Sequence, residues 1–139
     1  MRRIHWLGSG IAGAMIGFVT TTYGTDFAKP NLALHQVVEA MPTRQRQEVR
    51  GLTGTFKPGD RTVTHTHRFP VTVYVLESAV ALELEARKPI ILKAGEALVE
   101  PPLVKMTGYN RSASEPTRVV IFHISEIKAP FLDLAHSHQ

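Results

Sequence analysis

The sequence predicts an all-β protein whose strands pack as an antiparallel sandwich or barrel, and three observations support this fold class. Helical spacing of apolar residues ends near Arg46, and short runs rich in β-branched and aromatic residues follow. Turn-forming segments such as Pro58-Gly59-Asp60 separate these runs. The chain has 139 residues, 43% of them hydrophobic, which is enough for one buried core but too short for two ordinary domains. The seven predicted strands cover residues 48–56, 62–67, 71–76, 80–85, 89–92, 96–100 and 118–125.

The first 24 residues differ in composition from the rest of the chain. Arg2 and Arg3 precede an apolar, glycine-rich run over residues 7–19 that carries no charge, which is the layout of a secretory signal peptide. An uncleaved membrane anchor is the alternative, but this run is shorter than the roughly 20 residues needed to span a bilayer. We therefore expect a periplasmic or secreted protein with no stable membrane span once residues 1–24 are removed.

Residues 25–45 form a predicted N-terminal arm. Leu34, Val37, Val38 and Met41 recur at helical spacing, and Pro42 closes the segment. The arm is either a short helix or an irregular segment that packs on the domain.

Two of the predicted strands differ in pattern. Residues 80–85 alternate regularly, so Glu83 and Glu85 should face water rather than act as a catalytic carboxylate pair. Residues 71–76 are nearly all apolar, as expected for a strand that is buried on both faces.

Composition excludes several function classes. The chain has no cysteine, so disulfides, thiolate catalysis and zinc-thiolate sites are absent, and His, Asp, Glu and Met are the candidate metal ligands. The formal net charge is +4, from 16 basic and 12 acidic residues, and the leader carries two of the basic ones. Because the remaining basic residues are scattered, without an aromatic stacking pattern or a basic stripe, we expect no nucleic-acid partner.

His65 and His67 are the strongest candidates for a functional site. They are one residue apart just before an apolar strand, and residues i and i+2 of a strand point to the same face about 7 Å apart. Two imidazoles at that spacing can share one metal ion. The alternative is that His65 and His67 are polar residues on an exposed strand edge. The sequence contains no nucleophile motif or phosphate loop that would indicate a different kind of site.

Two motifs resemble those of the cupins. Gly59 is followed by five residues and then by His65 and His67, as in the first cupin motif. In the second motif, Gly95 is followed at the family spacing by Pro101 and then Asn110. The resemblance covers most of residues 47–126 and implies a double-stranded β-helix, or jelly-roll barrel, over residues 46–128. It also implies a polar tail over residues 129–139, a small-molecule ligand and a homodimer.

The sequence departs from the family at several positions. The glutamate ligand of the first motif falls at Val71, or one residue later at Thr72, and the histidine of the second motif falls at Met106. Two of the four ligands that the resemblance implies are therefore missing, and Val71 and Thr72 are expected to line the pocket. Two motif glycines are replaced by Ser78 and Leu103. If Ser78 keeps a left-handed backbone, the cost is about 1–2 kcal/mol.

Other residues can complete a site built on His65 and His67. The thioether of Met106 suits Cu(I), although methionine also serves as an adaptable core filler. His123 can point inward from the strand at 118–125 as an additional ligand, or be a hydrogen-bonded structural residue.

The remaining histidines are weaker candidates. His136 and His138 repeat the His-x-His spacing in a polar tail, His5 belongs to the leader, and His35 has no partner nearby in sequence.

The sequence supports three functional hypotheses. The first is an exported, non-catalytic cupin that binds a transition metal ion (Fe, Ni, Zn, Mn or Cu) or a small ligand through His65 and His67. The second is a metal-dependent enzyme of the dioxygenase or isomerase type with a reduced ligand set, and the third is a periplasmic copper-binding protein that uses Met106. No catalytic residue can be assigned, because fold alone does not establish an enzyme.

Overall fold

The computed structural model describes residues 28–135. The leader expected at residues 1–24, with His5, and the tail histidines His136 and His138 lie outside the described residues. The chain divides into two units, residues 1–30 and 31–139, and the fold described below belongs to the second.

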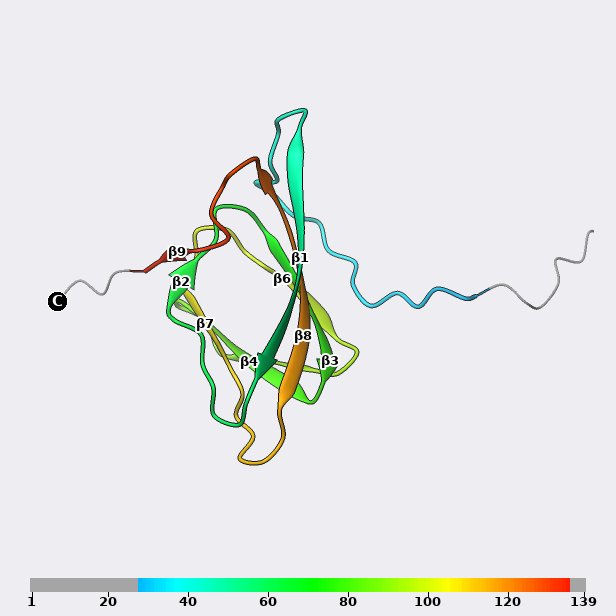
Figure 1. Ribbon diagram of the computed structural model, residues 1–139, viewed down its shortest axis with the longest axis vertical. Helices are drawn as coiled ribbons and strands as arrows, with labels where there is room; N and C mark the ends of the chain where they lie inside the picture. Colours follow the sequence, from blue (N-terminus) through cyan, green and yellow to red (C-terminus); the bar gives the residue numbers. More distant parts are fainter. Residues whose placement is uncertain (1–27, 136–139) are drawn as a thin grey trace, which may run out of the picture. The chain divides into compact units, whose positions relative to one another are not determined.

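The described residues form nine β-strands and no helix, so the predicted all-β class is confirmed. None of their segments is a helix long and apolar enough to cross a membrane. In chain order (Figure 1) the strands are β1 (Gln47–Phe56), β2 (His65–Thr66), β3 (Val71–Glu77), β4 (Ala79–Leu84), β5 (Ile90–Lys93), β6 (Ala97–Glu100), β7 (Met106–Tyr109), β8 (Thr117–Glu126) and β9 (Asp133–Leu134).

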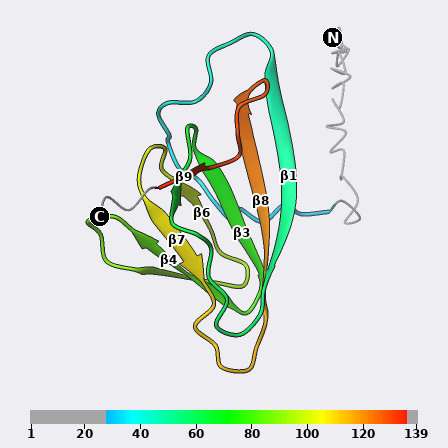
Figure 2. The ribbon, with the colours of Figure 1, turned by 60° about the vertical axis from the view of Figure 1, so that its left-hand side comes forward.

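The strands form two antiparallel sheets that enclose one interior. One sheet has the order β1-β8-β3-β6 and the other β5-β4-β7-β2-β9. Figure 2 shows the long strands β1, β8 and β3 side by side, with β4 and β7 in the opposing sheet. Chain neighbours lie in different sheets, except for β4 and β5, which pair with each other, as in a jelly roll.

Two strands were not predicted from the sequence. β7 is short and contains Gly108, which weakens its strand pattern, and β9 begins with the charged Asp133. The barrel also continues beyond the expected boundary at residue 128, because β9 pairs with β2 through His65 and Thr66. Tertiary pairing, rather than local propensity, makes these segments strands.

The interior is filled by alternate side chains of the strands. Val71, Val73 and Val75 of β3 are buried, whereas Thr72 and Tyr74 between them are only half-buried. The prediction that β3 is buried on both faces was therefore wrong. Only its inner face belongs to the barrel core, and the arm covers its outer face incompletely.

The N-terminal arm is irregular rather than helical. Leu34, Val38 and Met41 are half-buried, and they line grooves against outer-face residues of the four-stranded sheet such as Phe122. Val37, which a helix would place beside them, is 90% exposed. Contact with the sheet therefore selects an extended arm over the helix that the spacing allows.

The turns keep the backbone geometry of the motif glycines. Gly59 and Gly95 have φ of 81° and 86°. Ser78 and Leu103, which replace glycines, also have positive φ, 61° and 60°. The chain therefore retains left-handed turns at positions where its side chains disfavour them.

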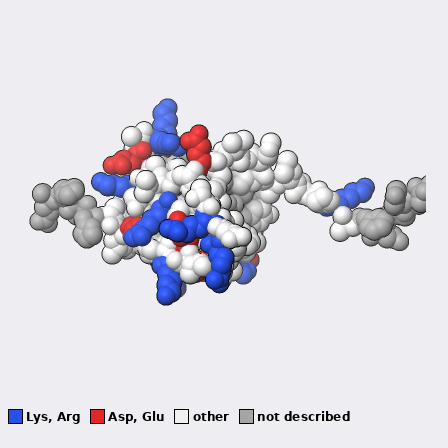
Figure 3. Space-filling model, turned by 90° about the horizontal axis from the view of Figure 1, so that it is seen from above, with Lys and Arg blue, Asp and Glu red and all other residues white. Residues whose placement is uncertain are grey.

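Surface charges of both signs are interspersed. Figure 3 shows Asp and Glu lying among Lys and Arg on the face seen from above. Among the described residues, Arg44 pairs with Glu126 and Arg68 with Asp133. The absence of a nucleic-acid partner stays a prediction.

Candidate metal and ligand site

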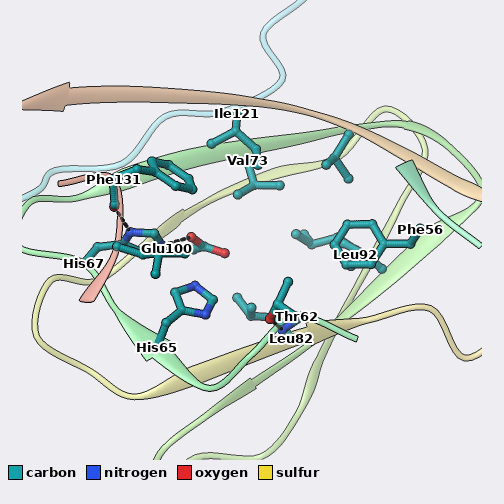
Figure 4. A pocket seen from close by; sticks show the side chains of 14 residues that line it. Phe56, Thr62, His65, His67, Val73, Leu82, Leu92, Glu100, Ile121 and Phe131 are labelled. Carbon is teal, nitrogen blue, oxygen red and sulfur yellow. Dashed lines mark hydrogen bonds and ion pairs between the residues drawn. The ribbon is translucent and has the colours of Figure 1, made fainter. Parts of the chain in front are cut away.

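Two histidines form the polar end of the barrel interior. His65 begins β2 and His67 follows it, and both side chains are buried. Their ring centroids are 4.8 Å apart. In Figure 4 both rings project toward the same cavity, so the two residues share a face as their spacing predicts.

Backbone carbonyl groups orient both rings. The Nδ1 atom of His65 lies 2.7 Å from the carbonyl oxygen of Val63, and the Nδ1 atom of His67 lies 2.7 Å from that of Phe131. Because a carbonyl oxygen only accepts, each Nδ1 carries the hydrogen and donates it. Nε2 is the nitrogen of each ring that is left to bind a metal, and a hydrogen bond from Nδ1 to a carbonyl oxygen is the arrangement that orients metal-binding histidines.

A buried carboxylate completes the polar end. Glu100, the last residue of β6, places Oε2 3.2 Å from Nε2 of His67, as the dashed line in Figure 4 shows. Glu100 is paired directly with Val71 across the sheet. A carboxylate therefore lies on the strand next to Val71, the position at which the cupin motif has its glutamate.

Glu100 was missed at the sequence level, although the sequence contains a signal for it. It ends a short apolar run, two residues after Leu98, so strand alternation places both side chains on one face. Leu98 packs on the core, which predicts a buried carboxylate at Glu100.

The cavity beside these residues is small and mostly apolar. Its volume is about 90 Å³. Figure 4 shows His65, His67 and Glu100 at one end and Phe56 and Leu92 at the other. The remaining lining residues are Thr62, Val73, Val80, Leu82, Gly108, Val119, Ile121, Phe131 and Leu132.

The donor atoms of this polar end fit a transition metal ion chemically. Two imidazole nitrogens and a carboxylate are ligands of Fe(II), Mn and Zn. The 3.2 Å between His67 and Glu100 is close to the roughly 3 Å that separates two ligands bound to one ion at about 2.1 Å each. No three His, Asp or Glu side chains within residues 28–135 already have an arrangement that could hold a metal ion. Binding therefore requires these side chains to rotate.

Similarity to known proteins is found in structure rather than in sequence. No family model and no curated protein matches the sequence. A cupin-like protein from Thermotoga maritima is similar with a TM-score of 0.56 and 21% identity, over 64% of this chain and 65% of that chain. An RmlC-like cupin family protein with a double-stranded β-helix fold, from Methanocaldococcus jannaschii, gives a TM-score of 0.53 at 18% identity, over 67% of this chain and 93% of that one. The chain has the cupin fold.

Some of the similar structures have a named activity. The DMSP lyase DddQ from Ruegeria pomeroyi gives a TM-score of 0.54 at 13% identity, over 62% of this chain. The match spans 42% of the length of that lyase, and at this identity it shows the fold alone.

Met106, at the position of the second cupin histidine, is buried in β7 and packs in an apolar cluster with Leu82 and Leu84. It is not among the residues that line the cavity. This placement matches the core-filler interpretation of Met106, although Met106 is also paired directly with His65 across the sheet, and the copper hypothesis stays a prediction.

The two predicted pocket residues lie elsewhere. Val71 is buried and inward-facing, but it is not among the residues that line the cavity. Thr72 lines the groove beneath the arm instead, because successive residues of a strand alternate between faces.

His123 is fully buried on the inner side of β8. Burial lowers the pKa of its imidazole, and charges at His67 and Arg50 lower it further, against the opposing effect of Glu48. These effects favour the neutral form of the His123 imidazole. It does not line the cavity itself.

Asn110 of the second cupin motif has a structural role. Its side-chain amide donates to the carbonyl groups of Phe56, Lys57 and Glu115, and its Oδ1 accepts from the backbone of Ser112. These bonds fix the loops at the apolar end of the barrel. Thus the two cupin motifs serve different purposes here, one at the site and the other in the framework.

Proposed function

We propose that this cupin-fold protein binds a transition metal ion through His65, His67 and Glu100. The supporting observation is that both Nδ1 atoms donate to backbone carbonyls, which leaves the Nε2 atoms as the metal-binding nitrogens, and Nε2 of His67 already lies beside a buried carboxylate. Burying a carboxylate is costly unless it is paired. A divalent cation would bind Glu100 and both Nε2 atoms at once, in place of the contact between Glu100 and His67.

The preferred metals follow from the donor atoms. Iron, manganese, zinc and nickel suit a mixed imidazole and carboxylate set, whereas Cu(I) favours softer ligands. Two histidines and one carboxylate leave coordination positions open, and a metal bound there would supply Lewis acidity to a ligand in the cavity.

The cavity size restricts the organic ligand. A cavity of about 150 Å³ accommodates benzene, and this one has about 90 Å³. We propose a ligand of about four to six non-hydrogen atoms, with a head group that coordinates metal at the polar end. Its short apolar tail would lie against Val73, Leu82 and Leu92.

Two further features belong to the proposal. The leader-like composition of residues 1–24 supports export to the periplasm or outside the cell. The exposed apolar side chains of Val49 and Phe122 on the outer face of the four-stranded sheet support a homodimer, since contiguous apolar surface is commonly an interface.

Metal analysis of protein purified without an affinity tag tests the proposal. His136→Ala and His138→Ala are introduced throughout, so that the tail does not bind metal. We expect near-stoichiometric metal in this parent and none in His65→Ala/His67→Ala. In Glu100→Gln we expect affinity to fall at least tenfold, because a neutral amide replaces the carboxylate.

Glu85→Gln is the matched control, because Glu85 is an exposed carboxylate in the turn after β4 and its variant should bind as the parent does. A folded parent without metal, or unchanged metal content in the double histidine variant, would contradict the proposal. Such a result would direct the search to an organic ligand alone.

A metal-dependent enzyme is the second candidate function. The open positions left by a two-histidine, one-carboxylate set favour it, since catalytic centres need a place for substrate. Metal-dependent turnover of a small substrate, abolished by Glu100→Gln, would distinguish this candidate from a binding protein.

A further inference from the structure

His123 is the starting point for an inference that rests on the proposed metal site. Its two ring nitrogens are the buried side-chain nitrogen or oxygen atoms that lack a hydrogen-bond partner within residues 28–135. Buried polar groups nearly always have a partner, and an exception indicates strain, a catalytic role, or a water or ion at the site. An imidazole with a free lone pair and no partner is also an unused metal ligand.

The neighbouring polar groups are already engaged. Arg50, which is paired with His123 across the sheet, forms a 2.6 Å ion pair with Glu48. His67 donates through Nδ1 to the carbonyl of Phe131, and its Nε2 faces Glu100. Rearranging these groups to satisfy His123 would break an existing interaction.

The sheet register places His123 within reach of the proposed ion. Val71 of β3 is paired with Glu100 on one side and with His123 on the other. Alternate strands of a sheet are roughly 10 Å apart, and His67 contacts Glu100 at 3.2 Å. The ring centroids of His67 and His123 are 6.2 Å apart.

That separation is compatible with a shared ion. With metal–nitrogen bonds of about 2.1 Å, two imidazole centroids on one ion are at most about 6.4 Å apart. The ring of Phe131 contacts both, at 5.0 Å from His67 and 5.5 Å from His123. It belongs to the irregular segment between β8 and β9, so its side chain can shift as the ligands converge.

We infer that His123 is a fourth protein ligand of the metal site, together with His65, His67 and Glu100. The lost carboxylate at Val71 is thus compensated from both neighbouring strands, by Glu100 on β6 and His123 on β8. Three imidazoles and one carboxylate hold a divalent ion more tightly than the three ligands at the cavity, and still leave room for an exogenous ligand.

The test compares His123→Leu with the full-length parent that carries His136→Ala and His138→Ala, and Co²⁺ is the probe. Leucine fills a similar volume and has no ligand atom. We expect the Co²⁺ affinity to fall at least tenfold and the visible Co²⁺ spectrum to change, because a nitrogen ligand is lost. The metal-free variant should melt roughly 4 °C or more above the metal-free parent, since an imidazole without a partner is removed from the interior.

Two more variants complete the design. His123→Gln keeps a polar group and serves if the leucine variant does not fold. His35→Leu, on the exposed arm, should bind Co²⁺ as the parent does. Parent-like affinity and spectrum in both His123 variants, or an equal loss in His35→Leu, would overturn the assignment of His123 while leaving the three-ligand site intact. A parent that binds no Co²⁺ would overturn both proposals.

Discussion

The two ends of the barrel interior differ in the side chains that fill them. At the apolar end, Val75, Val80, Leu92 and Val119 form a buried cluster, and the amide of Asn110 closes the adjoining loops with three donated hydrogen bonds. At the polar end, four titratable side chains are buried, and the two ring nitrogens of one of them, His123, have no hydrogen-bond partner among the described residues. The other three are His65, His67 and Glu100.

This difference separates stability from function within one core. Burial of an aliphatic side chain contributes about 1.5–3 kcal/mol, whereas an unsatisfied buried polar group costs about 1–3 kcal/mol. The apolar end thus holds the barrel together, whereas the unpartnered imidazole of His123 at the polar end carries a cost that the proposed ion would offset.

The largest expected effect comes from Leu92→Ala at the apolar end. Leu92 is buried and lines the far end of the cavity, so its truncation should destabilise the fold by about 3 kcal/mol through lost burial and the remaining void. Chemical denaturation measures this change. Metal affinity should stay near that of the parent, because Leu92 lies far from His65 and His67 in the cavity.

The enlarged cavity sharpens the comparison. In Leu92→Ala, ligands longer by two or three carbon atoms should gain affinity relative to short ones. A loss of metal affinity as large as that in Glu100→Gln would show that the two ends are not separable.

The fold was predictable because its signals are local and repeated. The seven predicted strands all exist, and the motif glycines Gly59 and Gly95 occupy left-handed turns. β7 and β9 were not predicted, because these short segments are stabilised by pairing with strands that are distant in sequence. β7 pairs with β2 and β4, and β9 pairs with β2.

The candidate site was predictable only in part. The two-residue period of a strand predicts that His65 and His67 share a face. That Glu100 lies beside Val71 depends on the register between β6 and β3, which a single sequence does not specify. The placement of Met106 among leucines likewise depends on which strands oppose it. His35 on the arm is exposed and belongs to neither end.

A smaller effect is expected from Leu103→Gly at the polar end. Leu103 is 75% exposed with φ of 60°, and its backbone N–H donates to the carbonyl of His67 at 2.7 Å. Glycine relieves the left-handed strain at little loss of burial, so the variant should be more stable by about 1 kcal/mol. Thermal and chemical denaturation both measure this gain.

Leu134→Gly provides the matched control for that variant. Leu134 is 60% exposed and lies in β9, where glycine gains nothing from a left-handed turn and should destabilise the strand by about 0.5–1 kcal/mol. Destabilisation of both variants would mean that the side chain of Leu103 makes a contribution larger than its strain.

The smallest effect is a pH-dependent one at the edge of the polar end. Arg68 donates to Asp133 through two hydrogen bonds of 2.8 and 3.0 Å, which tie β9 beside β2. These bonds hold the pKa of Asp133 below its ordinary value of 3.8. Their contribution to stability is therefore fully present above pH 3.8 and is lost as the pH falls through the lower pKa of the folded state.

Asp133→Asn removes this contribution, and since the pair is exposed we expect only a small loss of stability. Denaturation of both proteins across a pH series should show a constant difference above pH 3.8 that shrinks in more acidic solution. A difference that persists at the lowest pH would assign the loss to packing of β9 instead. Because the carbonyl of Phe131 on the adjoining segment accepts from His67, a parallel fall in metal affinity would show that the anchoring of β9 orients the histidine at the polar end.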